Sequence, residues 1–284
     1  MDTTHPTRLD AVLRAASMRI DPLDARWLLA HVCGRAQGWL YAHGDAVLSE
    51  AQTATFEALV SRRAAGEPVA YLIGSRAFWR LELAVSPATL IPRPETELLV
   101  EAALARLPPR RPARAADLGT GSGAIALAVA GERPDVSVVA TDASEAALEI
   151  ARRNAARHAL DRVEFRFGDW YGPLAGLRFD MLLSNPPYIA SGDPHLSRGD
   201  LRHEPPAALV SGPDGLDALR VLAAGASNHL HPGGWILVEH GFDQGPAVRA
   251  LFAAQGLIQV DTLRDLEARD RVTLGRRPPA PGGA

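Results

Sequence analysis

The sequence predicts an α/β fold in which a mostly parallel sheet, covered by helices on both faces, follows a small helical N-terminal domain. Three observations predict it. From residue 115 onward, apolar runs of strand length alternate with helical patterns, as in doubly covered parallel sheets. Glycines stand between the first strand and its helix. Before residue 75, apolar residues recur at helical spacing.

Length and composition indicate a protein of the cytoplasm. The 284 residues suffice for two domains, and 47% hydrophobic with 22% charged residues is ordinary for a globular protein. A net charge of −3 argues against a protein that coats nucleic acid. The single cysteine, Cys33, excludes an intrachain disulfide and fits a reducing compartment. Apolar runs fall short of the ~20 residues that cross a bilayer, so we expect no membrane partner.

Residues 1–74 are expected to form the helical domain. A helix over 21–34 has Asp21 as its cap, Pro22 in its first turn and Gly34 at its end. Another over 49–66 begins at Ser49. Residues 75–92 alternate in polarity and predict a hairpin that links two domains.

The main domain is expected over residues 93–277, followed by a disordered tail, 278–284. Its expected strands lie near 115–118, 136–142, 163–169, 179–185, 234–240, 257–263 and 270–276. Its expected helices cover 122–132, 144–158, 214–230 and 243–255. Ligands of such sheets bind beyond the carboxyl ends of the strands, so polar side chains at those ends are the candidate ligand contacts.

The first strand ends in a glycine turn, "DLGTGSG" (117–123), with Gly119, Gly121 and Gly123. Glycine lets the backbone turn tightly and approach a ligand, and the following helix offers free N–H groups. The competing interpretation is a glycine-rich connection without a ligand.

Two carboxylates near this turn indicate a nucleoside ligand with a cationic end. Asp142 closes the second strand nineteen residues after Gly123, about where an acidic residue meets ribose hydroxyls; alternatively it caps the next helix. Asp117 precedes the glycines and suits an ammonium group better than a pyrophosphate, which it would repel. S-adenosylmethionine is therefore favoured over a nicotinamide cofactor.

The third strand ends in "GDWYG" (168–172). Asp169 can accept a hydrogen bond from an adenine amino group, and Trp170 can form an apolar wall beside the ring. Ordinary core packing of Trp170 is the alternative.

The fourth strand ends in "NPPY", Asn185 to Tyr188. The Asn185 side-chain carbonyl and the carbonyls of Pro186 and Pro187 can hold a planar NH2 group, with Tyr188 as a wall. Such bonds strengthen as a sluggish amide nitrogen gains positive charge during methyl transfer. The alternative is a rigid turn that ends a strand.

The segment "RPETE" (93–97) allows two interpretations. Pro94 suits the first turn of a helix, and Glu95 and Glu97 favour its positive end. Alternatively residues 93–97 line the site near the cofactor, and Arg93 and Glu95 contact the substrate.

These motifs together resemble class I S-adenosylmethionine-dependent methyltransferases, whose Rossmann-like fold has a mostly parallel seven-stranded sheet. The segments 74–101, 203–220 and 267–277 are similar to the release-factor glutamine N5-methyltransferases, the HemK/PrmC family. The resemblance covers about residues 5–277. It implies methylation of the glutamine in the Gly-Gly-Gln motif of class 1 peptide chain release factors, with S-adenosyl-L-homocysteine as coproduct.

The resemblance also implies roles for individual residues. Cofactor contacts would come from Asp117, Gly119, Thr120, Gly121, Ser122, Gly123, Asp142, Asp169, Trp170 and Asn185. Substrate contacts would come from Asn185, Pro186, Pro187 and Tyr188, with Asn185, Pro186 and Tyr188 catalytic. The helical domain would help to dock the release factor.

Alternative functions remain open at this point. A sister group methylates a glutamine of ribosomal proteins and shares most motifs. The same acceptor pair would hold the amine of adenine in DNA or RNA, although we expect no stable nucleic-acid partner. A cofactor-sensing or ribosome-associated binding module is the non-enzymatic alternative. The nine histidines lack metal-ligand spacing, so no metal is expected.

Overall fold

The computed structural model describes residues 8–109 and 111–280. The end of the expected tail, residues 281–284, lies outside the described residues, as do residues 1–7 of the expected helical domain. The chain divides into two compact units. The first contains Met1–Ser75 and Arg198–His203, and the second contains Arg76–Ser197 and Glu204–Ala284.

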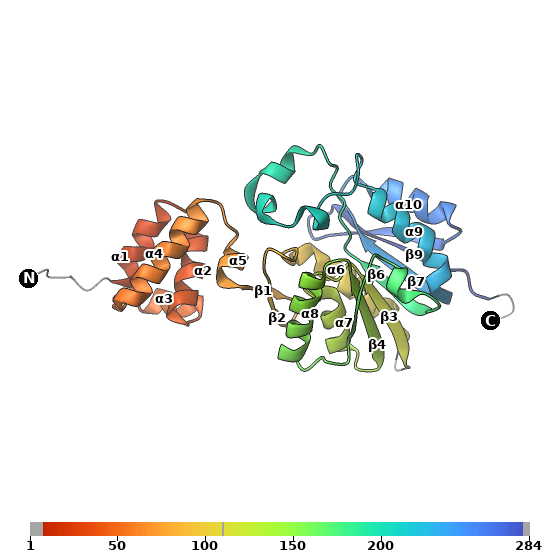
Figure 1. Ribbon diagram of the computed structural model, residues 1–284, viewed down its shortest axis with the longest axis horizontal. Coiled ribbons are helices and arrows are strands. Elements are labelled where there is room, and N and C mark those ends of the chain that lie inside the picture. The colour runs from red at the N-terminus through yellow and green to blue at the C-terminus, as the bar shows by residue number, and fades with distance from the viewer. Residues whose placement is uncertain (1–7, 110, 281–284) are drawn as a thin grey trace, which may run out of the picture. The chain divides into compact units, whose positions relative to one another are not determined.

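The described part of the first unit is built from helices (Figure 1). They are α1 (Leu9–Ser17), α2 (Pro22–Cys33), α3 (Gln37–Ala42), α4 (Glu50–Ala64) and α5 (Val69–Ile73). Their apolar faces meet in a core that includes Leu9, Leu28, Leu29 and Phe56, each at most 1% exposed.

The ends of α2 and α4 follow from capping residues that the sequence predicted. The Asp21 side chain accepts a hydrogen bond from Leu23 N, and Gly34 ends α2 in the left-handed region at φ +61°. Ser49 and Gln52 form a reciprocal capping box at the start of α4. These two helix predictions are confirmed to within two residues at each end.

The stretch Arg198–His203 belongs to the helical unit although it lies far along the chain. Arg63 pairs with Asp24 and with Asp200, each at 2.7 Å. Arg202 donates to the Ala65 carbonyl at 3.1 Å. Ion pairs and a backbone carbonyl therefore hold this stretch on α4.

The second unit contains a seven-stranded sheet in the order β5-β4-β3-β6-β7-β9-β8. Its strands are β3 (Ala113–Leu118), β4 (Val136–Asp142), β5 (Glu164–Phe167), β6 (Phe179–Ser184), β7 (Leu230–Glu239), β8 (Ile258–Arg264) and β9 (Asp270–Arg276). The first five run parallel, and β9 is antiparallel to β7 and β8. The predicted mostly parallel sheet is confirmed.

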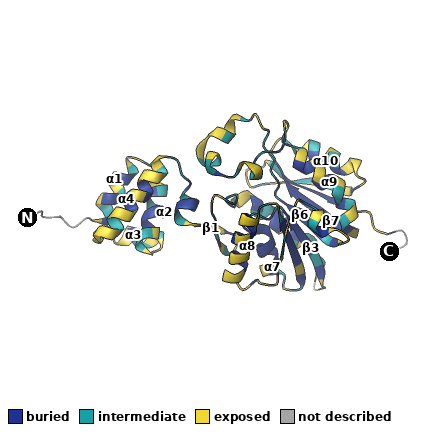
Figure 2. Ribbon diagram, in the orientation of Figure 1, coloured by how far each residue is buried: buried dark blue, intermediate teal, exposed yellow. Residues whose placement is uncertain are grey.

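Helices cover both faces of this sheet, because alternate side chains of each strand point to opposite faces. The helices are α6 (Glu97–Arg106), α7 (Ala124–Glu132), α8 (Glu145–Arg157), α9 (Asp217–His229) and α10 (Gly245–Ala254). Helices α6, α7 and α8 share a core with Ala115 and Leu183, whereas α9 and α10 share one with Ala116 and Leu182. The central strands β3, β4 and β6 between these two layers are mostly buried (Figure 2), whereas the edge strands β5 and β8 are largely exposed or half-buried.

A short hairpin, β1 (Ser75–Phe78) and β2 (Leu81–Ala84), forms a separate two-stranded sheet. The buried Asn154 side chain of α8 joins the end of β2 to the glycine turn. Its Oδ1 accepts from Ala84 N at 2.7 Å, and its Nδ2 donates to the carbonyls of Ala84 (3.0 Å) and Ser122 (2.9 Å).

We expect Asn154→Ala to lower the free energy of unfolding by roughly 3 kcal/mol, because three backbone groups lose their partner inside the protein. Urea denaturation would measure this change. Asn228→Ala, at an exposed position on α9, is the matched control and should change stability by less than about 0.5 kcal/mol. Equal effects of both substitutions would contradict the assignment.

In the part of the chain that the structure describes, none of the helices is long and apolar enough to span a membrane.

Candidate functional site

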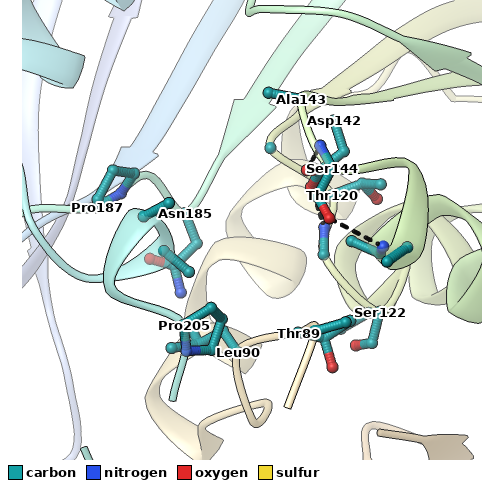
Figure 3. A pocket seen from close by; sticks show the side chains of 18 of the residues that line it. Thr89, Leu90, Thr120, Ser122, Asp142, Ala143, Ser144, Asn185, Pro187 and Pro205 are labelled. Atoms are coloured by element: carbon teal, nitrogen blue, oxygen red, sulfur yellow. Dashed lines mark hydrogen bonds between the residues drawn. The ribbon is translucent and has the colours of Figure 1, made fainter. Parts of the chain in front are cut away.

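A cavity of about 580 Å³ lies at the carboxyl ends of β3, β4, β5 and β6 (Figure 3). Its volume falls within the range of small-molecule sites. The walls include Gly119, Thr120, Gly121, Ser122, Asp142, Gly168, Asp169, Trp170, Asn185 and Pro187. In Figure 3, Asn185 and Pro187 lie on one side of the cavity, and Thr120 and Asp142 on the other.

The glycine turn supplies backbone to the cavity wall. Gly119 and Gly121 have φ of +75° and +56°, a region that favours glycine. Gly123 does not line the cavity. A Cβ there would lie 3.1 Å from the Leu127 side chain and 3.3 Å from that of Ala151. The first two glycines therefore shape the cavity, and Gly123 permits close packing of α7 and α8.

Asp142 lies at the cavity wall, at the end of β4. Its Oδ2 accepts from Gly121 N at 2.8 Å, and its Oδ1 accepts from Ser144 N at 2.9 Å. Burial raises the pKa of this carboxyl, opposed by the backbone hydrogen bonds. Because a carboxylate oxygen accepts more than one bond, both oxygens can also receive ligand hydroxyls.

Asp117 lies outside the cavity wall, fully buried beneath the glycine turn. Its Oδ2 accepts from Thr120 Oγ1 at 2.6 Å and from Ala126 N at 3.2 Å. Its Oδ1 has no hydrogen-bond partner among the described residues. Burial raises the pKa of Asp117 to about 7.

The raised pKa of Asp117 has a consequence for stability. The stability that this group contributes is fully present below its ordinary pKa near 4, where the folded and the unfolded chain are both protonated, and it is lost as pH rises through about 7. Asp117→Asn removes the charge that the parent acquires at high pH. The free energy of unfolding of the variant minus that of the parent should therefore be larger at pH 8 than at pH 5, by roughly 2–3 kcal/mol. Denaturation at both pH values would measure it, and an equal effect at both would contradict a buried, titrating Asp117.

Asp169 and Trp170 both line the cavity after β5. Asp169 is exposed, and Trp170 is partly buried. The Trp170 ring lies beside the turn, since a Cβ on Gly119 would be 3.6 Å from its Cζ3. Trp170 also packs against the core of α9 and α10. Its two interpretations from the sequence are therefore compatible.

Asn185 follows β6 and presents its side chain to the cavity. Its Nδ2 donates to Thr96 Oγ1 at 3.1 Å. Its Oδ1 is buried, and no partner for it is present within the described ranges. An acceptor withdrawn from water without a partner is costly, so this oxygen is suited to a donor that the protein itself does not provide.

The backbone of the "NPPY" turn is held from two sides. Gln244 Nε2 donates to the Tyr188 carbonyl at 3.0 Å. Ile189 N donates to Leu209 O and Ser211 N donates to Ile189 O, both at 2.9 Å. Pro187 lines the cavity, whereas Pro186 and Tyr188 do not. The Tyr188 hydroxyl donates to Glu239 Oε1 at 3.2 Å.

The segment "RPETE" contributes Thr96 to the cavity wall, but neither Arg93 nor Glu95 lines it. Arg93 pairs with the fully buried carboxylate of Glu204, which also accepts from Ile91 N at 3.0 Å. Glu95 is exposed, in the 3-10 helix η1 (Pro94–Thr96) that precedes α6. The ion pair thus fixes the entry to this helix.

Sequence reasoning missed much of the wall. The residues it did not single out are Ala88, Thr89, Leu90, Pro92, Thr96, Ala124, Ile125, Ala143, Ser144, Ala146, Ala147, Gly168, Pro205, Ala207 and Ala208. Most are small or apolar and form no motif. Thr96 had a signal, because it stands inside a segment already suspected of lining the site.

The fold, with its cavity at a glycine turn and an acidic strand end, is that of the methyltransferases. The family model described as "Methyltransferase small domain" matches residues 94–199. A methyltransferase from Pyrococcus furiosus has a TM-score of 0.53 at 19% identity and covers 78% of this chain and 98% of its own, which supports the fold alone.

The comparisons also identify the particular family. The model described as "PrmC N-terminal domain" matches residues 7–74. A release factor glutamine methyltransferase from Xylella fastidiosa is 62% identical over 94% of this chain and 98% of its own length. One from Escherichia coli is 49% identical over 89% and 91%. The chain belongs to the release factor glutamine methyltransferases.

Proposed function

We propose that this chain transfers a methyl group from S-adenosylmethionine to the side-chain amide nitrogen (N5) of the glutamine in the Gly-Gly-Gln motif of class 1 peptide chain release factors, supporting translation termination. Membership of the family supports this proposal. The observation that carries it is the buried Asn185 Oδ1, an acceptor on the cavity wall without a partner among the described residues.

The cavity suits S-adenosylmethionine in size and in chemistry. We assign the ribose diol to Asp142, whose two oxygens already accept from backbone N–H groups and retain free lone pairs. The turn from Gly119 to Gly123 brings backbone close to the ligand, directly through Gly119–Ser122 and by packing through Gly123. Asp169 and Trp170 are assigned to the adenine.

Asp117 supports the same site from below. We assign to it the shape of the glycine turn, through its bonds to Thr120 and Ala126. Its ionised form also produces a negative field that favours the cationic end of the ligand.

When bound, S-adenosylmethionine supplies an electrophilic methyl group on a sulfonium and is released as S-adenosyl-L-homocysteine. The residues of this chain position the nucleophile. Asn185 Oδ1 and the Pro186 carbonyl accept the two hydrogens of the substrate amide, and Pro187 and Tyr188 frame its plane. These bonds strengthen as positive charge develops on the nitrogen, which stabilises the transition state selectively. The surplus proton then leaves to solvent, so no metal and no prior base are required.

The remaining parts of the chain are assigned to docking and location. The helical domain, residues 1–74, would contact the release factor, with the hairpin of residues 75–92 leading into the methyltransferase domain, residues 93–277. Arg93 and Glu95 would contact the substrate at the edge of the site. The protein would act in the cytoplasm.

Incubation with methyl-labelled S-adenosylmethionine tests the proposed function. We expect label on a purified release factor and none on a release factor whose Gly-Gly-Gln glutamine is replaced by alanine. Label on a ribosomal protein alone would replace the substrate with that of the sister group. Label on DNA or RNA alone, or cofactor binding without transfer to any acceptor, would overturn the proposal.

A further inference from the structure

A chain of polar groups lies behind Asn185. The Asn185 Nδ2 donates to Thr96 Oγ1 at 3.1 Å. Thr96 is 4% exposed, at the end of η1. Next to it, Glu239 ends β7 and is 1% exposed. Glu239 Oε1 accepts from the Tyr188 hydroxyl at 3.2 Å, and its Oε2 is buried without a hydrogen-bond partner among the described residues. The hydroxyls of Thr96 and Tyr188 both favour the ionised form of this carboxyl.

The charge on Glu239 determines the direction of every hydrogen bond in this chain. An ionised carboxylate accepts and does not donate. The Thr96 hydroxyl therefore directs its proton to Glu239, whose buried Oε2 has no other partner among the described residues. Toward Asn185, Thr96 Oγ1 can then only accept a hydrogen bond. It therefore receives the NH2 group of Asn185, and the Asn185 carbonyl oxygen is left for the cavity.

The opposite orientation of the Asn185 amide would be unfavourable on both sides. Its oxygen would meet the lone pairs of Thr96 Oγ1. Its NH2 group would point into the cavity, where it would oppose the N–H groups of an incoming amide. An amide oxygen and nitrogen differ little in shape, so packing alone does not choose between the two orientations.

We propose that Thr96 and Glu239 are positioning residues that fix the amide orientation of Asn185, so that the site presents an acceptor and selects a substrate bearing an NH2 group. The proposal rests on the proposed function for the consequence in catalysis. The orientation itself is a property of the protein without substrate, and it can be measured separately.

Thr96 provides a matched pair of variants. Thr96→Val keeps the shape and removes the hydroxyl, whereas Thr96→Ser keeps the hydroxyl. We expect kcat on the release factor to fall about tenfold in Thr96→Val, the equivalent of one net hydrogen bond, and to recover most of that loss in Thr96→Ser. The Kd for S-adenosylmethionine, measured by calorimetry, should change less than about twofold in both. Equal kcat in the valine and serine variants would overturn the role of Thr96.

Glu239→Gln tests the role of charge. Like the protonated acid, glutamine can donate to Thr96, which frees the Thr96 proton to turn toward Asn185 and admits the wrong orientation. Burial raises the pKa of Glu239 to about 7, so kcat of the parent should rise as pH passes through that value. In Glu239→Gln, kcat at pH 8 should be about tenfold lower, and this rise should be lost.

The other groups around Glu239 do not explain a difference between the pH profiles of kcat in the parent and in Glu239→Gln. They are Thr96 and Glu95 on η1, Tyr188 after β6 and Arg271 on β9. Tyr188 and Arg271 have raised pKa values and keep their protons between pH 6 and 8. Asp117 titrates near 7 in parent and variant alike, so the difference between the two profiles isolates Glu239. Identical profiles would overturn the proposal.

A spectroscopic readout separates this proposal from the proposed function. The chain contains three asparagines, so ¹⁵N-asparagine labelling gives three side-chain NH2 signals, and Asn185→Ala identifies one of them. We expect the Asn185 signal to shift as pH passes through about 7 in the parent and to stay constant in Glu239→Gln. If the Asn185 signal shifts in the parent and not in Glu239→Gln, but no glutamine is methylated, the proposed function is wrong and the positioning proposal stands. If methylation occurs and the signal does not move in the parent, the positioning proposal fails alone.

Discussion

Asn185→Ala is expected to lower kcat on a release factor by roughly 2–4 kcal/mol in barrier, or about 30- to 1000-fold, the range for losing one aligned transition-state acceptor. The substitution removes the Oδ1 that has no partner among the described residues. It also releases the Thr96 hydroxyl, to which Asn185 donates. Single-turnover kinetics with saturating cofactor would measure the chemical step.

The controls for Asn185→Ala separate catalysis from cofactor binding and folding. Calorimetry should give a cofactor Kd close to that of the parent. Asn228→Ala, on the exposed surface of α9, should retain full activity. Abolished cofactor binding in Asn185→Ala would mean that Asn185 serves the cofactor first, contrary to the mechanism proposed above.

Asp142→Ala is expected to weaken cofactor binding by roughly 10- to 100-fold, since hydrogen bonds to a charged group contribute about 1.5–3 kcal/mol. Both carboxylate oxygens are lost, and with them the anchors of Gly121 N and Ser144 N. Calorimetric titration with S-adenosyl-L-homocysteine would measure the change without turnover.

The matched control for Asp142 is Asp161→Ala, an exposed carboxylate ahead of β5. It should bind the cofactor as the parent does. Asp142→Asn keeps one carbonyl acceptor and should show an intermediate loss. An unchanged Kd in Asp142→Ala would show that Asp142 merely caps α8, the alternative that the sequence left open.

The parts of the fold that could be predicted are those in which local chemistry agrees with packing. Apolar runs closed by a polar residue gave β4 and β9 with the bounds expected, and capping residues located α2 and α4. The helix expected over 122–132 begins at Ala124, because Gly123 at φ +86° still belongs to the turn.

Strand β7 was predicted too short for a physical reason. It begins at Leu230 and not at residue 234, although its first residues include Pro232 and Gly233, which disfavour strands. Pairing of Leu230 with Phe179 on β6, through an irregular register, extends it. Contacts between segments far apart in sequence carry no local signal.

In the candidate site, too, residues with a local sequence signal were predicted and those that depend on distant contacts were not. Residues at a strand end, such as Asp142 in β4 and Asn185 just after β6, were found because strand ends converge at one edge of a parallel sheet. Glu239 stands at such an end too, yet its role depends on a hydroxyl from η1. Asp117 was expected at the ligand and lies beneath the turn, away from the cavity wall, because the strand still alternates at that position.

A crystal structure with S-adenosyl-L-homocysteine and a release-factor domain bearing the Gly-Gly-Gln motif tests the central claim most directly. We predict that the glutamine amide nitrogen lies within about 3.2 Å of both Asn185 Oδ1 and the Pro186 carbonyl oxygen, with its open face toward the sulfur. A glutamine held elsewhere, with the Asn185 oxygen bonded to the protein itself, would contradict the account.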